Sequence, residues 1–215
     1  MSVAAVPQPI VPHPIRLPRS ESDETAAMLA RAFRDDPMTR FILPDAASRE
    51  RLLPWLMGAT VRYGLHHGEV YASASPCGID GAAIWLPPGE TRLTFGRMLR
   101  AGMLAAPLRL GFAAFGRFMT LAGRVDEVHG RVASMPHWYL WGLGVAPDRQ
   151  GRGLGGELLQ PVLARADATR TACYLETFNP ASVAFYRKHG FAVAAEEDIT
   201  RDGPHFWAMV RPPFA

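Results

Sequence analysis

The residues best able to do chemistry lie between Leu143 and Phe191. A glycine-rich turn stands directly before a helical pattern, and it reads Gln150-Gly151-Arg152-Gly153-Leu154-Gly155. Three glycines in six residues allow a tight backbone turn that points several N–H groups at one place. The unsatisfied N–H groups and the positive dipole end of the following helix face the same place. The sequence therefore predicts an anion-binding cradle, best suited to a pyrophosphate.

Two ionisable side chains follow the cradle. Glu176 lies near the end of a strand-like apolar stretch, residues 172–177, and Tyr186 lies on a later helical pattern, one turn after Ser182. A carboxylate can accept a proton from an attacking amine, and a phenol can donate one to a leaving group. Each residue also has a structural interpretation. Glu176 could pair with an arginine or cap the next helix, and Tyr186 could be a core residue.

The glycine turn is compatible with two further interpretations. Gly151, Gly153 and Gly156 satisfy the dinucleotide-binding fingerprint, and Glu176 stands at the spacing of a ribose-binding acid. However, five residues separate the preceding strand from the first glycine. The chain before Val145 also lacks the alternating strands and helices of a doubly wound sheet, which argues against a dinucleotide site. A purely structural glycine turn is the other alternative.

Taken together, these residues resemble the GNAT-type N-acetyltransferases. The acyl-CoA signature of that family is Gln or Arg, two residues, Gly, one residue, then Gly or Ala, and Gln150, Gly153 and Gly155 fulfil it. The chain is most similar to the puromycin N-acetyltransferase-like group, through residues 32–37, 137–140, 175–177 and 206–209, with Asn179, Phe185-Tyr186 and Gly190-Phe191 in order. The resemblance covers roughly residues 14–213 and is thin between 87 and 135.

The resemblance implies that acetyl-CoA is a co-substrate and that a metal is not required. It assigns the acetyl-CoA contacts to Leu143, Gly144, Val145, Gln150, Gly151, Arg152, Gly153, Leu154, Gly155, Gly156, Asn179, Ser182 and Tyr186. It also implies that the central strand bends away from its neighbour, so that the pantetheine arm hydrogen-bonds in the gap. Gly142 and Gly144 are suited to a bulge there. The Val145 N–H could stabilise the oxyanion.

The resemblance further implies catalytic roles for the two ionisable side chains. Tyr186 is then the general acid for the departing thiolate, and Glu176 is our candidate for the general base. Asp35 and Asp36 are the next candidates if Glu176 is structural. Asn179 is expected to cap its helix and to help hold the pantetheine.

Periodicity predicts the elements that must position these residues. Strands are expected over 15–17, 69–75, 82–86, 137–145, 172–177, 191–196 and 205–210, and helices over 20–33, over 48–66 and after the glycine turn. The expected fold class is α/β (α+β), a single GNAT-like domain with a mixed, mostly antiparallel sheet of six or seven strands flanked by helices. Residues 1–13 are expected to be a flexible Pro-rich tail, and residues 14–215 the acyltransferase domain.

Residues 90–135 are expected to form a helical insert before the central strand. Apolar residues mark one face, and arginines recur at heptad spacing on another, at Arg117, Arg124 and Arg131. We expect amphipathic helices packed on the sheet with a solvated arginine stripe, in preference to a membrane-surface or partner-binding helix. Because a GNAT-like core needs only a short segment at this point, the insert is expected to form a wall of the acceptor pocket.

Composition agrees with one enzyme-sized domain. The 215 residues are 48% hydrophobic, which suffices for a single sizeable core, and the net charge of only +3 without like-charge runs argues against nucleic acid as a partner. The two cysteines, Cys77 and Cys173, form neither a disulfide framework nor a metal site. Without an export signal or a membrane-spanning segment, a cytoplasmic location is expected.

The sequence therefore predicts an acetyl-CoA-dependent N-acetyltransferase that acetylates the amine of a small molecule by direct attack in a ternary complex. An antibiotic-like or aminonucleoside acceptor is suggested only by the resemblance. A non-catalytic acyl-CoA-binding sensor and an acyltransferase acting on a protein amine remain as alternatives.

Overall fold

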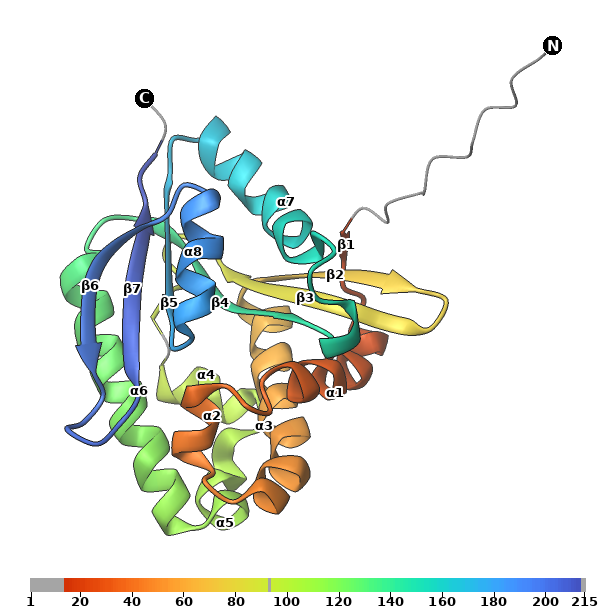
Figure 1. Ribbon diagram of the computed structural model, residues 1–215, viewed down its shortest axis with the longest axis vertical. Coiled ribbons are helices and arrows are strands. Elements are labelled where there is room, and N and C mark those ends of the chain that lie inside the picture. Colours follow the sequence, from red (N-terminus) through yellow and green to blue (C-terminus); the bar gives the residue numbers. More distant parts are fainter. Residues whose placement is uncertain (1–13, 93, 214–215) are drawn as a thin grey trace.

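One seven-stranded sheet organises the chain, as seen in the computed structural model, which describes residues 14–92 and 94–213 (Figure 1). The strand order is β1-β2-β3-β4-β5-β7-β6. The strands are β1 Ile15–Arg16, β2 Glu69–Ser75, β3 Gly78–Leu86, β4 His137–Val145, β5 Ala172–Thr177, β6 Ala192–Asp198 and β7 His205–Arg211. All neighbouring strands are antiparallel except β4 and β5, which confirms the predicted mixed, mostly antiparallel sheet. The predicted tail, residues 1–13, lies outside the described residues.

Helices cover both faces of the sheet (Figure 1). They are α1 Ser22–Ala32, α2 Pro37–Ile42, α3 Ala46–His67, α4 Phe95–Arg100, α5 Ala106–Leu110, α6 Phe112–Val132, α7 Leu154–Ala168 and α8 Pro180–Lys188. Side chains alternate between the faces because successive strand residues point in opposite directions. Tyr139 and Tyr174 join the core with α1, α3 and α6, whereas Leu140 and Leu175 join the core with α7 and α8.

The central strands β4 and β5 separate part of the way along the sheet. Their parallel pairing runs from His137 opposite Ala172 to Leu140 opposite Leu175 and then stops, while β4 continues along β3 as far as Val145. The register between β3 and β4 shifts at Ile84/Trp85, opposite the stretch that contains Gly142. The predicted bulge and divergence are therefore confirmed. In the described residues, the β5-facing edge of residues 141–145 has no strand partner.

Several predicted boundaries need correction. The first helix begins at Ser22 rather than at residue 20, because residues 19–21 form a 3-10 turn. The β2–β3 hairpin turn is shorter than predicted, because Gly78 at φ 115° lets β3 begin there. Sequence reasoning also missed α2, whose first turn is capped by Asp36: its carboxylate accepts a 2.9 Å hydrogen bond from the Met38 N–H.

The predicted insert contains α4, α5 and α6, and its arginine stripe is partly solvated, because the side chains of Arg131 and Arg124 are 53% and 35% exposed. Arg117 donates from Nε and Nη2 to the Ile42 carbonyl oxygen, at 3.1 and 2.9 Å, so it satisfies a carbonyl at the end of α2. Arg124 and Arg131 both pair with Glu197 of β6. The stripe therefore ties α6 to α2 and to the sheet edge. Within residues 14–92 and 94–213, no helix is long and apolar enough to cross a membrane.

Candidate active site

The glycine-rich turn has the backbone conformation expected of a cradle. Gly151 and Gly153 have φ values of 76° and 87°, a region that side chains with a Cβ rarely adopt. A Cβ added at either position would meet no atom within 4 Å, so their conformation, rather than packing, requires glycine. Gly153 precedes α7 without a side-chain cap, which leaves the first N–H groups of α7 available to an anion. Arg152 is exposed beside them.

The next two glycines serve a different purpose. A Cβ at Gly155 would lie 3.2 Å from Cζ of Phe185, and one at Gly156 would lie 3.0 Å from Cε1 of His189. Both neighbours belong to the α8 segment, so these glycines allow α7 and α8 to pack closely. The structure thus gives Gly155 and Gly156 a packing role that needs no ligand.

The free edge of β4 lies next to the cradle in the chain. Val145 is the last residue of β4, and its carbonyl accepts a 3.2 Å hydrogen bond from Nε2 of Gln150 in the turn. Gly144 is required by packing, because a Cβ there would come within 2.6 Å of Leu29 on α1. Helix α1 therefore presses against this end of β4, and Leu143, Gly144 and Val145 form a continuous strand edge beside the start of α7.

Glu176 stands at the point where β4 and β5 separate. It is the first β5 residue beyond the last β4–β5 pair. The Tyr139 hydroxyl donates a 2.7 Å hydrogen bond to Oε2 of Glu176. Oε1 is buried and has no hydrogen-bond partner in the described part of the chain. Burial raises the pKa of Glu176 to about 7, against the opposing effect of the Tyr139 and Tyr174 hydroxyls.

The structural alternatives for Glu176 do not hold. Among the described residues no arginine pairs with it. The cap of α8 is Asn179, whose Oδ1 accepts a 3.0 Å hydrogen bond from the Ala181 N–H, as predicted. A buried carboxyl group whose pKa is raised to about 7 has a property expected of a general base.

Tyr186 lies on α8 one turn after Ser182. Its ring is part of the core and packs edge-on against Phe185 and Phe191. Its hydroxyl makes no hydrogen bond to any described residue, and burial raises the pKa of Tyr186, so it remains protonated at neutral pH. The side chain is thus a core residue and is also able to donate a proton.

Asp36 is a second carboxylate near Tyr186. Burial raises the pKa of Asp36 to about 6, and the charge of Asp36 in turn raises the pKa of Tyr186. Asp35, by contrast, is exposed and points to Arg49, 3.8 Å away. The Asp-Pro pair in the sequence indicated only a helix boundary. Sequence analysis did name Asp35 and Asp36 as the next candidate bases, but it did not predict that the charge of Asp36 would act on Tyr186.

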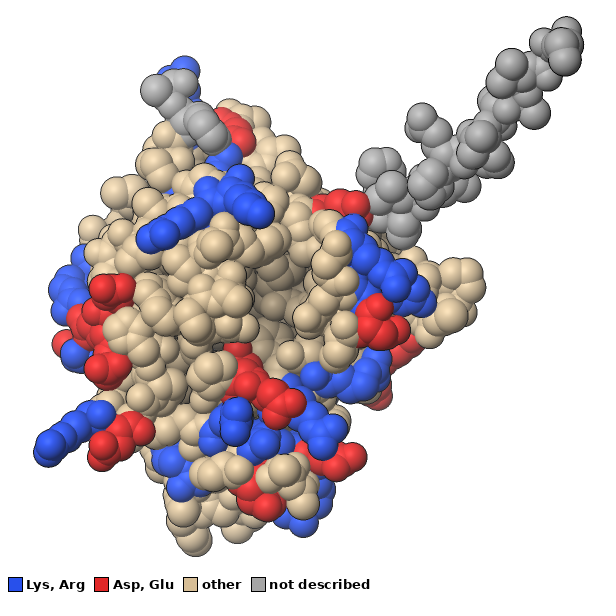
Figure 2. Space-filling model, viewed as in Figure 1, with Lys and Arg blue, Asp and Glu red and all other residues tan. Residues whose placement is uncertain are grey.

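The face that carries these residues is hollowed. In Figure 2 the hollow is bordered by α8, the start of α7 and α1, with acidic side chains on the side of α2 and basic side chains beside the start of α7. Arg149 in the glycine turn region pairs with Asp80 at 3.2 Å, so part of the basic charge is neutralised. The described residues contain no group of three or more His, Cys, Asp and Glu able to hold a metal ion.

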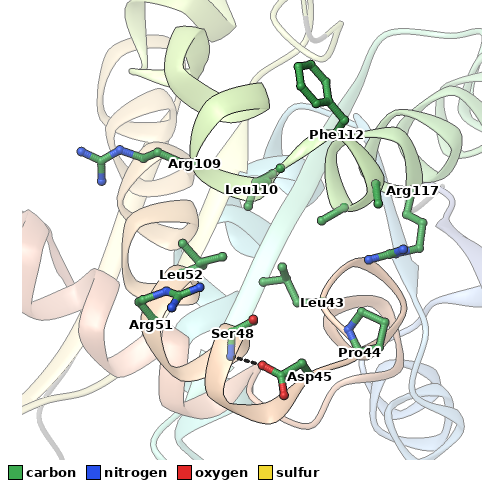
Figure 3. A pocket seen from close by; sticks show the side chains of 13 residues that line it. Leu43, Pro44, Asp45, Ser48, Arg51, Leu52, Arg109, Leu110, Phe112 and Arg117 are labelled. Atoms are coloured by element: carbon green, nitrogen blue, oxygen red, sulfur yellow. Dashed lines mark hydrogen bonds between the residues drawn. The ribbon is translucent and has the colours of Figure 1, made fainter.

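Two cavities lie away from Glu176 and Tyr186. One, of about 320 Å³, lies between α2–α3 and α5–α6, and Figure 3 shows Leu43, Leu52 and Leu110 lining it while the guanidinium of Arg109 extends outward. The other, of about 410 Å³, lies beside α7, α8 and the end of β7. The insert therefore does wall a cavity, but none of the predicted catalytic residues lines it.

The family model described as the acetyltransferase (GNAT) family matches residues 110–191, the segment from α6 through α8 that contains the glycine turn, Glu176 and Tyr186. A Dictyostelium discoideum protein named as a probable serine/threonine-protein kinase is 22% identical in an alignment 208 residues long that covers 86% of this chain. The chain spans only 21% of the length of that relative.

Three solved structures share the fold over almost the whole chain. A structure of histone acetyltransferase HPA2 and related acetyltransferase from Corynebacterium glutamicum is 21% identical, with a TM-score of 0.61, and the match covers 96% of this chain and 98% of that one. Arylalkylamine N-acetyltransferase 2 from Aedes aegypti is 15% identical, with a TM-score of 0.65 and coverages of 93% and 97%. A Drosophila melanogaster polyamine N-acetyltransferase is 17% identical, with a TM-score of 0.58 and coverages of 92% and 97%.

At these identities the likeness establishes the fold, which is that of a single GNAT-like domain. The family model covers residues 110–191, less than half of the chain.

Proposed function

We propose that this GNAT-like protein is an acetyl-CoA-dependent N-acetyltransferase that acetylates the amine of a small molecule in a ternary complex. The observation that carries the proposal is the fork between β4 and β5. Glu176 is the first residue beyond the last strand pair, and the unpaired β4 edge leads from there to the glycine turn at the start of α7. The candidate base, the unpaired strand edge and the glycine turn thus follow one another from the fork to the start of α7.

The residues present fit acetyl-CoA. Gly151 and Gly153 leave open space at the N-terminus of α7, where a pyrophosphate would be held by N–H groups and by Arg152. The unpaired edge of Leu143, Gly144 and Val145 would hold the pantetheine amides as an added strand does. Asn179 and Ser182, at the start of α8, would complete this site. When bound, acetyl-CoA supplies a thioester that an amine can attack.

The proposed chemistry divides between two side chains. Glu176 accepts a proton from the amine as the C–N bond forms, and its pKa near 7 leaves it ionised for this task at slightly alkaline pH. The Val145 N–H is a donor for the oxyanion. Tyr186 donates its proton to the sulfur as the C–S bond breaks. Asp36, near Tyr186, has two possible roles in this scheme. It is the alternative base for the amine, or it reprotonates Tyr186 after Tyr186 has donated its proton.

The proposal also concerns the kind of amine that receives the acetyl group. The structural neighbours named above act, by their names, on arylalkylamines and polyamines, which supports an amine acceptor of small size. An aminonucleoside acceptor of the kind suggested by the puromycin-enzyme resemblance remains a prediction, as does transfer to a protein amine.

The test is CoA-thiol release from acetyl-CoA across a panel of amines, with the acetylated product identified by mass spectrometry. The panel should contain an arylalkylamine, a polyamine, an aminonucleoside and a peptide with a free N-terminus. The proposal expects turnover with at least one small amine. Turnover with the peptide alone would favour a protein acceptor, and acetyl-CoA binding without turnover on any amine would favour the non-catalytic sensor.

A further inference from the structure

A short segment of the helical insert is apolar on both of its sides. It runs from Met103 to Leu110, contains α5 and lies at the lower tip of the molecule in Figure 1. Met103, Ala106 and Leu110 are buried and hold one side against the core. Leu104 and Leu108, four residues apart on the other side, are 72% and 84% exposed. Because a helix that is apolar all round is normally buried all round, the outer side of this segment is suited to a partner.

Phe112 extends the exposed apolar surface. It is the first residue of α6 and is 83% exposed, and in Figure 3 its ring points away from the neighbouring cavity. We call Leu104, Leu108 and Phe112 the apolar tip. These three are the most exposed large hydrophobic side chains in the described part of the chain. Single exposed apolar side chains are ordinary, but three within nine residues mark an interaction surface.

The surroundings of the apolar tip are basic. Residues 91–125 contain six arginines and no Asp or Glu, which leaves 17 basic and 20 acidic residues for the rest of the chain. Arg100 and Arg109 are exposed, and neither has a carboxylate partner among the described residues. The Arg109 guanidinium lies 5.5 Å from the centre of the Trp55 ring on α3, and exposed Arg51 lines the same cavity as Arg109. The surface therefore matches a partner that offers both hydrocarbon and negative charge.

This combination distinguishes between the kinds of partner. A nucleic acid would meet the arginines but would leave the Leu and Phe side chains without an apolar contact. A second copy related by two-fold symmetry would bring the same basic surface against itself. Asp45, which lines the neighbouring cavity, is engaged in capping α3, where it accepts a 2.7 Å hydrogen bond from the Ser48 N–H. A bilayer with anionic lipids supplies both contacts, because apolar side chains enter the boundary of the acyl chains and arginines meet the headgroups.

We infer that the apolar tip docks onto the surface of an anionic lipid bilayer. Leu104, Leu108 and Phe112 enter the boundary between headgroups and acyl chains, and Arg100 and Arg109 pair with the anionic headgroups. The contact is peripheral, since the segment is short and its inner side stays packed on the core. The inference goes beyond acetyl transfer and does not depend on it.

The experiment is co-sedimentation of the full chain with vesicles of phosphatidylcholine alone or of phosphatidylcholine mixed with phosphatidylglycerol. Wild type should bind the mixed vesicles roughly tenfold or more tightly than the neutral ones, and added salt should weaken this binding. The double variant Leu104→Ser with Leu108→Ser should bind the mixed vesicles roughly tenfold or more weakly than wild type, because it loses the hydrocarbon that enters the bilayer.

Each substitution has a matched control. Met135 is 55% exposed and follows the far end of α6, whose 21 residues span about 30 Å, so Met135→Ser should bind within about twofold of wild type. Arg109→Gln should lower binding to the mixed vesicles roughly fivefold, the effect of one arginine near an anionic surface. Exposed Arg170, just after the end of α7 at the upper end of Figure 1, is its control, and Arg170→Gln should bind within about twofold of wild type.

The melting temperature without lipid shows whether the double serine variant folds. Because Leu104 and Leu108 are largely exposed, it should stay within about 2 °C of wild type. Equal binding of wild type to both kinds of vesicle, binding to neither, or an equal loss in Met135→Ser overturns the inference. So does a wild-type dimer that the double variant abolishes, which would place a second copy on the tip. Retention on immobilised polyglutamate without binding to the mixed vesicles would indicate an acidic protein partner and overturns it too.

Discussion

The hydroxyl of Tyr139 on β4 donates a 2.7 Å hydrogen bond to Oε2 of Glu176 on β5, at the point where the two strands separate. This contact orients the carboxyl group and leaves Oε1 as its free oxygen. Burial raises the pKa of Glu176 to about 7. The residue therefore changes charge close to neutral pH, and both activity and stability should respond to that change.

The pH dependence of activity should report Glu176. Only the ionised carboxylate accepts a proton, so wild-type kcat/KM should rise as the pH increases through about 7. Glu176→Gln keeps the shape and hydrogen-bonding reach of the side chain but cannot accept a proton. We expect a large loss of kcat/KM near pH 7 and partial recovery toward the pKa of the acceptor amine. A pH–rate profile that matches wild type would contradict this role and direct attention to Asp36.

Stability should depend on pH through the same group. The folded pKa of Glu176, about 7, lies above its ordinary value of 4.5, so folding favours the protonated form. The contribution of Glu176 to stability is therefore full below pH 4.5 and is lost as the pH rises through 7. Wild type loses this contribution between these limits, whereas Glu176→Gln does not. The free energy of unfolding of Glu176→Gln, relative to that of wild type, should therefore increase by on the order of 3 kcal/mol as the pH rises. Urea denaturation of both proteins at pH 4.5 and 8 measures this, and an unchanged difference would refute it.

Substitutions in the glycine turn should separate anion binding from folding. Acetyl-CoA at a hundredfold excess over its Kd should stabilise wild type by about 2.7 kcal/mol, whereas NADH should have no effect. Gly153→Asp should abolish the acetyl-CoA shift, because it adds a negative charge where the structure leaves open space for phosphate. Gly151→Ala imposes a similar positive-φ strain of about 1 kcal/mol without the charge, so it should retain a shift. A thermal shift with NADH alone would contradict the assignment.

The buried histidine pair should make the fold sensitive to acid. Burial lowers the pKa of His129 from 6.5 to about 4, with smaller effects from His137 and Arg92. Its contribution to stability is therefore full above pH 6.5 and is lost as the pH falls toward 4, by on the order of 3 kcal/mol.

His129→Phe keeps a flat ring against Tyr174 but cannot be protonated. It should be about 1 kcal/mol less stable than wild type at pH 7, and this deficit should shrink at pH 5. Replacing the exposed His66 by Asn is the control, and it should leave the wild-type pH dependence intact. A deficit that stays constant across this pH range would mean that His129 does not titrate as described.

Features that depend on short stretches of sequence were predicted well. The glycine turn follows from local backbone requirements, and the positive φ values of Gly151 and Gly153 bear it out. The separation of β4 from β5 was anticipated from glycines in a strand together with the family resemblance, and the pairing confirms it. The position of Glu176 at the end of β5 also followed from the strand pattern.

Features that depend on distant elements could not be read from the sequence. The contact between Tyr139 and Glu176 requires the parallel register of β4 and β5, which no pattern specifies. The charge of Asp36 acts on Tyr186, 150 positions later in the chain, only through the tertiary structure. The partners of the α6 arginines were not predicted, because Arg117 and its heptad partners have targets on α2 and β6 that only the tertiary structure brings into reach.

The most direct test of the account is a single-turnover experiment at pH 7.5 with wild type, Tyr186→Phe and Glu176→Gln, each first saturated with acetyl-CoA and then mixed with the preferred amine. Acetyl-CoA binding is measured in the same samples. The account predicts that all three proteins bind acetyl-CoA, and that acetyl transfer is slowed by roughly 10²–10⁴ in each variant, the range for loss of a general acid or base. Variants that bind acetyl-CoA and acetylate the amine as fast as wild type would contradict it.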